Sequence, residues 1–441
     1  MTMVASSLTS RSADQGLKSG LNPPVFVLSV FDTGLAVLRL LAQRGIWVEG
    51  FDHVAENAGF ATRRATTHFV PEPENATEGL LRQIARRVET LNRGKAVLIP
   101  ASDYYVQWIC DHADELARHA IWLLPPVPTT RLILKKDSQM ALAAKAGLQV
   151  PWTLALPHTL ADKAFLDLTA EVSCRCQYPL FLKPVTGHLW AKHFVGKGTL
   201  VRSSGELRRA FSGTREAGVD TVLQEVIPGA PSQNYEVSYY ADRSGALSRL
   251  FVMRKMRQEP PDFGTACYGI TEGNEQRVRH LRALVERWIA ATGYRGIGNT
   301  EFKWDPRSNE FVYIETNPRV WQQVDLAASA GQNFPMTLYS DVTGLSAVQP
   351  GSGFKPGLCW SDPIRDAHAL VRAEDTALSR IKGALWTWPL ATLRASCRGA
   401  FQLSDVGPGL KTMDYGARVL RGALGLLRRV LGLRTTCLKE P

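Results

Sequence analysis

Three oxygen-bearing side chains, Glu301, Glu315 and Asn317, lie on two short apolar segments that a Pro-Arg-Ser-Asn turn separates. Side chains alternate across a strand, so Glu315 and Asn317 share one face. A hairpin centred near residues 307–308 places Glu301 roughly opposite Glu315. Two carboxylates and an amide suit a hard cation such as Mg²⁺, which leaves further coordination positions for water and substrate phosphates. The pattern predicts a nucleotide–metal site; the simpler alternative is a hairpin with polar residues on its wet face.

Two lysines upstream stand where an ammonium group needs an anionic partner. Lys183 ends a short apolar run that begins at Tyr178, and a lysine charge is almost never buried unpaired. Lys136 precedes the helix-like segment 140–147. Both lysines are therefore candidates for phosphate contacts. Lys135 stays open as the alternative to Lys136, and a strand-end lysine that reaches solvent is the alternative for Lys183.

The hairpin resembles the metal-binding strands of the ATP-grasp superfamily, in which an acidic residue and a following Glu-x-Asn hold the ions that bridge the ATP phosphates. The resemblance implies Mg²⁺ (or Mn²⁺) on Glu301, Glu315 and Asn317. It implies that Lys136 and Lys183 contact the phosphates of ATP. A loop between Lys183 and residue 200, with Gly187, Gly196, Gly198, Lys192 and Lys197, is similar to the family's loop that closes over the phosphates.

The segment 221–229 resembles the family's linker strand, which reads adenine through backbone groups. This resemblance implies an adenine edge at Gln224, Glu225 and Ile227, and a ribose contact at Glu236. A Walker-type Gly-x-x-x-x-Gly-Lys-Ser/Thr sequence is absent from the chain, which excludes a P-loop nucleotide site.

The elements that must position these residues form an α/β (α+β) chain of several domains. The segments 25–30, 35–44 and 46–52 read as strand, helix and strand, the start of a Rossmann-like parallel sheet. Because this start lacks Gly-x-Gly-x-x-Gly, nicotinamide binding is not expected. We predict a disordered tail at 1–22, the Rossmann-like domain at 23–128, a two-lobed ATP-grasp module at 129–345 and a small C-terminal extension at 346–441.

Composition narrows the function classes. The chain has 441 residues, a net charge of +11 and seven cysteines without zinc spacing, which indicates a reduced, cytoplasmic setting. Basic residues are not interleaved with stacking aromatics, so nucleic acid is not an expected partner. From Lys411 onward seven Lys/Arg face two Asp/Glu. Residues 417–433 read as a basic amphipathic helix, which suits either a membrane surface or packing within the protein. The oligomeric state stays open.

The family resemblance implies an ATP-dependent carboxylate–amine ligase. A small-molecule carboxylate would be activated as an acyl phosphate, and an amine, an amino acid or peptide, would displace phosphate. The residues expected to hold the carboxylate or the acyl phosphate are Arg254, Arg257 and Arg319. The loops 32–34 and 102–104 are substrate candidates, with helix capping as their alternative.

Within the superfamily the chain looks most similar to the predicted carboligase branch related to D-aspartate ligase. This similarity rests on three motifs: residues 98–103, Arg254-Lys-x-Arg257 and Asn317-Pro-Arg-x-Trp-Gln322. Three alternatives remain: a carboxylase or kinase on the same ATP site, a non-catalytic nucleotide-binding regulator, and a membrane-surface adaptor.

Overall fold

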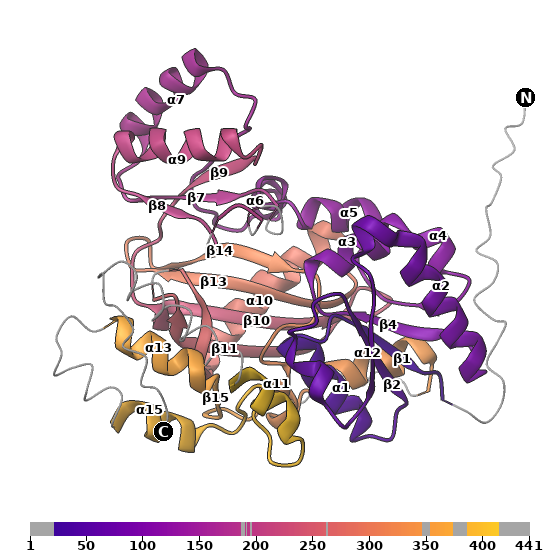
Figure 1. Ribbon diagram of the computed structural model, residues 1–441. Coiled ribbons are helices and arrows are strands. Elements are labelled where there is room, and N and C mark those ends of the chain that lie inside the picture. The colour runs from indigo at the N-terminus through magenta and orange to yellow at the C-terminus, as the bar shows by residue number, and fades with distance from the viewer. Residues whose placement is uncertain are drawn as a thin grey trace, which may run out of the picture.

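The computed structural model describes residues 22–186, 190, 192–194, 196–261, 263–345, 353–373 and 386–413. These residues form one parallel sheet followed by two antiparallel sheets, with helices packed on them (Figure 1). The α/β class that the sequence predicts is confirmed. Within the described ranges, no helix combines the length and the apolar composition that crossing a bilayer requires.

The first sheet is parallel, with the strand order β3-β2-β1-β4-β5. Its strands are β1 (Val25–Leu28), β2 (Val48–Asp52), β3 (Thr66–Phe69), β4 (Ala96–Pro100) and β5 (Ala120–Ile121). The helices that join them are α1 (Asp32–Ala42), α2 (Pro73–Leu91), α3 (Asp103–Asp111) and α4 (Ala113–Leu116). Because β1 and β4 are buried along their whole length, they read as continuous apolar runs in the sequence. This sheet is the predicted Rossmann-like domain.

A small antiparallel sheet, with the order β6-β9-β7-β8, forms the lobe at the top of Figure 1. Helices α5 (Val127–Ile133) and α6 (Lys136–Lys145) lead into it from the first domain. Its strands and helices are β6 (Thr153–Leu156), α7 (Asp162–Arg175), β7 (Leu180–Pro184), β8 (Thr199–Val201), α9 (Ser204–Glu216) and β9 (Thr221–Glu225). Phe165 of α7 and Phe211 of α9 stack with their ring centroids 4.4 Å apart, so the two helices share one small core with the sheet.

A large antiparallel sheet has the order β14-β13-β10-β11-β12-β15. Its strands are β10 (Asn234–Ala241), β11 (Leu247–Glu259), β12 (Thr265–Thr271), β13 (Gly296–Asp305), β14 (Glu310–Asn317) and β15 (Cys359–Ser361). Helix α10 (Glu275–Thr292) packs on one face, where Trp288 joins Val237 and Val252 in one cluster. The other face shares a cluster with the first domain and with α11 (Val324–Ser329) and α12 (Phe334–Thr343).

The hairpin of β13 and β14 has the register that the sequence predicts. Glu301 pairs with Glu315 and Asn299 pairs with Asn317 across the two antiparallel strands. The turn covers residues 306–309 and ends at Asn309, whose φ of 55° is a left-handed conformation that asparagine tolerates. A β-bulge between Glu301 and Phe302 shifts the pairing on the far side of the site.

The C-terminal part of the chain folds back onto the earlier domains. Helices α13 (Pro363–Ala373) and α15 (Trp388–Arg394) pack beside β15, and the segment that follows contacts α1. There Arg39 of α1, which is 2% exposed, donates from Nε to Asp405 Oδ2 at 2.9 Å. The carboxylate of Asp405 also accepts from Thr62 Oγ1 at 2.6 Å. Burial opposes ionisation of Asp405, yet these hydrogen bonds and the Arg39 charge lower its pKa.

Loss of this buried ion pair should destabilise the protein strongly. We expect Asp405→Asn to lower the free energy of unfolding by about 3–5 kcal/mol, because the guanidinium of Arg39 stays buried without its counter-charge. Urea denaturation at neutral pH measures the change. Asp111→Asn, in the solvent-exposed pair with Arg131, serves as the control and should cost less than about 1 kcal/mol. Equal effects of the two substitutions would contradict the buried pair's role.

Two sequence predictions fall outside the described residues. The predicted disordered tail at 1–22 has only Asn22 within them. The predicted basic helix at 417–433 lies wholly outside them, as do parts of the extension at 346–441.

Candidate active site

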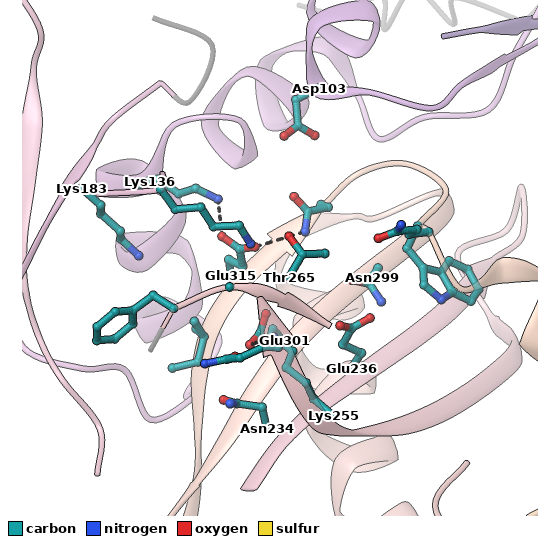
Figure 2. A pocket seen from close by; sticks show the side chains of 18 of the residues that line it. Asp103, Lys136, Lys183, Asn234, Glu236, Lys255, Thr265, Asn299, Glu301 and Glu315 are labelled. Atoms are coloured by element: carbon teal, nitrogen blue, oxygen red, sulfur yellow. Dashed lines mark hydrogen bonds and ion pairs between the residues drawn. The ribbon is translucent and has the colours of Figure 1, made fainter. Parts of the chain in front are cut away.

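A cavity of about 630 Å³ lies where the first domain, the small lobe and the large sheet meet. Its described lining includes seven Lys/Arg side chains and five Asp/Glu side chains. They are Lys136, Lys183, Lys197, Lys255, Lys303, Arg319 and Arg365, with Asp103, Glu225, Glu236, Glu301 and Glu315. In Figure 2, Asp103 reaches toward the cavity from the first domain, and the glutamates stand on the large sheet. This excess of positive charge favours an anionic ligand.

Three glutamates form a row across three neighbouring strands at the floor of the cavity. Glu236 of β10 pairs with Glu301 of β13, and Glu301 pairs with Glu315 of β14. Like charges directly opposite each other destabilise a sheet, so the row needs cations beside it.

Lysines outside the row of glutamates balance its negative charge. Lys136 donates from Nζ to Glu315 Oε2 at 2.7 Å, and Lys255 donates from Nζ to Glu301 Oε1 at 2.7 Å. The ammonium group of Lys136 holds the pKa of Glu315 well below its usual value, with Lys197 and Lys183 adding to the effect. Glu315 is therefore ionised across the physiological pH range and can serve as an anionic ligand.

Glu236 differs from Glu315 in the direction of its pKa shift. It is 8% exposed, and burial raises its pKa to about 7, while Lys255 opposes the rise. A carboxyl group at this edge of the row can accept hydrogen bonds from hydroxyl groups of a ligand.

Lys183 extends into the cavity from the end of β7. Its Nζ donates to Gln224 Oε1 at 2.8 Å, and the amide of Gln224 donates in turn to Thr153 Oγ1 at 3.0 Å. Burial, followed by the repulsion of Lys136, lowers the pKa of Lys183 to about 8. An anion bound here would stabilise the charged form.

The lowered pKa of Lys183 predicts a pH dependence. A lysine loses its charge as pH rises through its pKa, so we expect kcat/KM for ATP to fall above about pH 8. Steady-state kinetics from neutral to alkaline pH measure the profile. Lys183→Arg keeps its charge throughout this range and should move the fall to higher pH. Coincident profiles of the two proteins would show that another group causes the fall.

The loop after β7 also brings a lysine to the cavity. Lys197 lies in the lining, and burial lowers its pKa. At the neighbouring Gly198, a Cβ atom would lie 2.5 Å from the backbone carbonyl oxygen of Leu182. A residue with a side chain would therefore displace the loop from β7. Of the other predicted loop residues, Gly187 lies outside the described part of the chain.

The linker strand predicted to read adenine borders the same cavity. Gln224, Glu225 and Ile227 all belong to its lining. The Glu225 carboxylate accepts from the Trp152 backbone amide at 3.3 Å and pairs with Arg307 at 2.8 Å. These contacts hold the end of β9 against the β13–β14 hairpin. Between the two lysines left open at α6, the cavity lining contains Lys136 and not Lys135.

Of the three predicted arginines, Arg319 lies at the cavity. Its Nε donates to Asp103 Oδ1 at 2.7 Å, which joins the end of the large sheet to the first domain. Thr33, Ser102 and Asp103, from the two predicted substrate loops, line the cavity with it. Arg319 therefore stands where these loops meet the row of glutamates.

The prediction that Arg254 and Arg257 hold the substrate carboxylate needs correction, because neither lines the cavity. Arg254 lies on the strand face that α10 covers, beside Tyr235. Arg257 donates twice to Asp366 of α13, at 2.6 and 2.8 Å, and stacks over Tyr268.

Lys255, which lies between these two arginines in the sequence and was not predicted, lines the cavity instead. Its face of β11 also carries Phe251 and Met253, which pack toward the first domain, whereas Leu250 and Val252 pack toward α10. Because side chains alternate along a strand, Lys255 shares the cavity face and Arg254 does not. The alternation of apolar side chains along β11 was the feature of the sequence that could have identified Lys255.

A second end of the cavity gathers donors that no motif predicted. Arg365 of α13 lines it, as do Trp321 and Gln323 after β14. The indole Nε1 of Trp321 and the amide Nε2 of Gln323 are buried and have no hydrogen-bond partner in the structure. Because both atoms are inaccessible to solvent, Arg365 is the donor that a ligand with acceptor oxygens would meet here.

Among the described residues, three or more histidine, cysteine or acidic side chains do not come together as a ready-made metal cluster. A Mg²⁺ site that is completed by nucleotide phosphates does not need one, since it uses one or two carboxylates together with substrate oxygens.

Comparison with known proteins identifies the fold. No model of a known protein family matches the chain. D-aspartate ligase of Enterococcus faecium (strain Aus0004) is 23% identical over 249 residues, which cover 55% of this chain and 57% of that ligase. The chain therefore matches little more than half the length of this relative.

Two solved structures share the architecture at low sequence identity. The L-amino acid ligase from Bacillus licheniformis superimposes with a TM-score of 0.55 at 15% identity, over 75% of this chain and 78% of that one. Biotin carboxylase from Campylobacter jejuni, in its β-γ-ATP complex, gives a TM-score of 0.58 at 17% identity, over 76% and 74%. The chain has the ATP-grasp fold, as its resemblance to that superfamily implies.

Proposed function

We propose that this ATP-grasp chain is an ATP-dependent carboxylate–amine ligase. The observation that carries the proposal is the single cavity at which Lys136 and Lys183 meet the carboxylates of Glu301 and Glu315. These cations and anions come from three separate parts of the chain. Their convergence supports a catalytic role over a regulator that binds nucleotide without turnover.

The donor set fits a divalent cation. Glu301, Glu315 and Asn317 would hold Mg²⁺ (or Mn²⁺), because they offer two carboxylates and an amide on one face of the hairpin. When bound, the ion offsets negative charge on the β- and γ-phosphoryl oxygens of ATP. Lys136 and Lys255, which now neutralise these glutamates, would then be free to share the phosphate charge.

The nucleotide would lie between the two lobes. Lys136, Lys183 and Lys197 would bind its phosphates, and Glu236 would accept hydrogen bonds from the ribose hydroxyls. Gln224, Glu225 and Ile227 would border the adenine. In this arrangement, catalysis comes mainly from positioning and electrostatics.

The acceptor substrate would occupy the end lined by Arg319 and Arg365. A carboxylate oxygen of this substrate attacks the γ-phosphorus of ATP, and ADP departs with the electrons of the broken P–O bond. The amine nitrogen of the second substrate then attacks the acyl carbon of the acyl phosphate. Inorganic phosphate leaves, and the amine loses a proton as the amide forms. The acidic Asp103 beside Arg319 suits an ammonium group, so we propose amino acids or short peptides as substrates.

Product analysis tests the reaction class. The protein is incubated with ATP, Mg²⁺ and a panel of amino acids and dipeptides, and phosphate release is measured with mass spectrometry of the products. ADP, phosphate and a new amide in equal amounts are the expected result. Incorporation of labelled bicarbonate would identify the carboxylase alternative instead, and a stable phosphorylated acceptor would identify a kinase.

Arg365 provides a prediction about acceptor binding. We expect Arg365→Met to raise the KM for the acidic substrate about tenfold or more and to change the KM for ATP less than about twofold, because a charge-assisted contact is lost at one end only. Steady-state kinetics with each substrate varied in turn give the two values. Arg372→Met, on the same helix but paired with Glu259, is the control and should change neither. A rise in the KM for ATP would place Arg365 at the nucleotide instead.

A cytoplasmic setting suits a reaction that consumes ATP, and Cys110, Cys267, Cys359 and Cys397 form no disulfide. Peripheral membrane contact is a separate proposal, which rests on other residues.

A further inference from the structure

The helix of residues 406–413 turns its apolar side chains to solvent. Val406, Leu410 and Met413 recur at intervals of four and three residues, which places them on one helical face, and all three are exposed. Leu403, just before this helix, is 99% exposed. A helix on the surface of a globular domain normally buries such a stripe, so this face is adapted to a partner.

Helix α15 has the same arrangement. Trp386, Leu390 and Leu393 repeat the spacing of four and three residues, and they are 68%, 49% and 75% exposed. Both helices lie in the lower part of the molecule in Figure 1, away from the small lobe. Residues 386–413, which include both helices, expose seven large apolar side chains.

The stripe continues in phase along the sequence beyond the described residues. Steps of three and four residues lead from Met413 to Ala417, Leu420, Leu424, Leu427 and Leu431. Residues 386–441 also contain nine Lys/Arg and only three Asp/Glu.

We infer that the exposed apolar residues of segment 386–413, namely Trp386, Leu390, Leu393, Leu403, Val406, Leu410 and Met413, dock on an anionic lipid surface. Apolar side chains enter the boundary between head groups and acyl chains, and the surrounding basic residues are attracted to anionic head groups. This inference goes beyond the proposed ligase activity and does not depend on it.

Charge complementarity favours lipid over a second copy of the chain. In a coiled-coil pair, the positions that flank the apolar seam hold opposite charges that select the partner. Here residues 386–441 carry nine Lys/Arg against three Asp/Glu. Two copies would bring together segments of the same sign, whereas anionic head groups neutralise their positive charge.

Vesicle co-sedimentation of the full-length protein tests the inference. We expect about tenfold stronger binding to vesicles of phosphatidylcholine with phosphatidylglycerol than to phosphatidylcholine alone, and partial release at high salt. Leu410→Gln combined with Met413→Gln should lower binding to the anionic vesicles about tenfold, because the apolar insertion is lost. ATP binding by the same variant should equal that of the original protein, which verifies that it is folded.

The matched control removes two exposed leucines elsewhere. Leu132→Gln combined with Leu166→Gln, on α5 and α7, should leave vesicle binding unchanged. Equal binding to both vesicle types, or equal loss in the two double variants, would overturn the inference. A stable dimer in sedimentation equilibrium that Leu410→Gln and Met413→Gln dissociate, without vesicle binding, would assign the face to a second copy instead.

Discussion

Glu315→Gln should reduce ATP turnover by roughly 10³-fold while the protein stays folded. The substitution keeps the size of the side chain but removes a charge that Lys136, Lys183 and Lys197 surround. The site then loses an anionic oxygen ligand for the divalent cation, and three ammonium groups lose their shared counter-charge. Phosphate release at saturating ATP, repeated over a range of Mg²⁺ concentrations, measures the effect.

A glutamate on the same strand offers the control for this experiment. Glu310 begins β14, is exposed outside the cavity lining and lies 3.8 Å from His280. Glu310→Gln should therefore keep turnover within about twofold. Full activity of Glu315→Gln would contradict the assignment of Glu315 as a metal ligand and the mechanism that depends on it.

Lys255→Met should lower kcat/KM for ATP by about 10²-fold or more. The side chain is 2% exposed and compensates Glu301 directly, so its loss leaves Glu301 beside Glu236 without a neighbouring cation on β11. Repulsion within the row then favours protonation of one glutamate, and the site binds both metal and phosphate less well. Nucleotide binding and turnover are measured together, with circular dichroism to verify the fold.

The preceding residue on the same strand provides a comparison. Arg254 is also basic, but it lies on the opposite face of β11 from Lys255. We expect Arg254→Met to change kcat/KM less than about threefold, since this side chain lies toward α10 beside Tyr235. Where Lys255→Met fails to fold, Lys255→Arg, which keeps the charge, takes its place and should retain more activity. A larger loss from Arg254→Met than from Lys255→Met would mean that the faces of β11 are assigned wrongly.

The end of the cavity where we propose that the acceptor binds bears on the choice between a ligase and a carboxylase. Both proposed reactions would use the same lysines and glutamates, so the difference would lie in the acceptor. Here Asp103 of the first domain contacts Arg319, and Arg365 of α13 lines the same cavity. An oppositely charged set suits a zwitterionic amino acid better than bicarbonate, which carries no ammonium group.

Local sequence was sufficient to predict how the β13–β14 hairpin groups its polar side chains. Alternation along β14 places Glu315 and Asn317 on one face, and the short turn places Glu301 opposite Glu315, so the hairpin could be predicted from residue types alone. Lys183 was predictable for a similar reason, since an apolar strand that ends in a lysine requires a nearby anion. The parallel first sheet followed from its continuous apolar strands.

Only the tertiary structure decided which cations complete the site. A strand has two faces, and its sequence alone does not say which one a helix covers; the packing of α10 assigned Arg254 to one face and Lys255 to the other. Arg319, Asp103 and Arg365 are far apart in the chain, so their meeting depends on how the first domain and α13 pack on the large sheet. Sequence determined the pairing of Glu301 with Glu315, because their spacing along the hairpin is local. Domain packing decided the contact of Asp103 with Arg319, because these residues become neighbours only after the chain has folded.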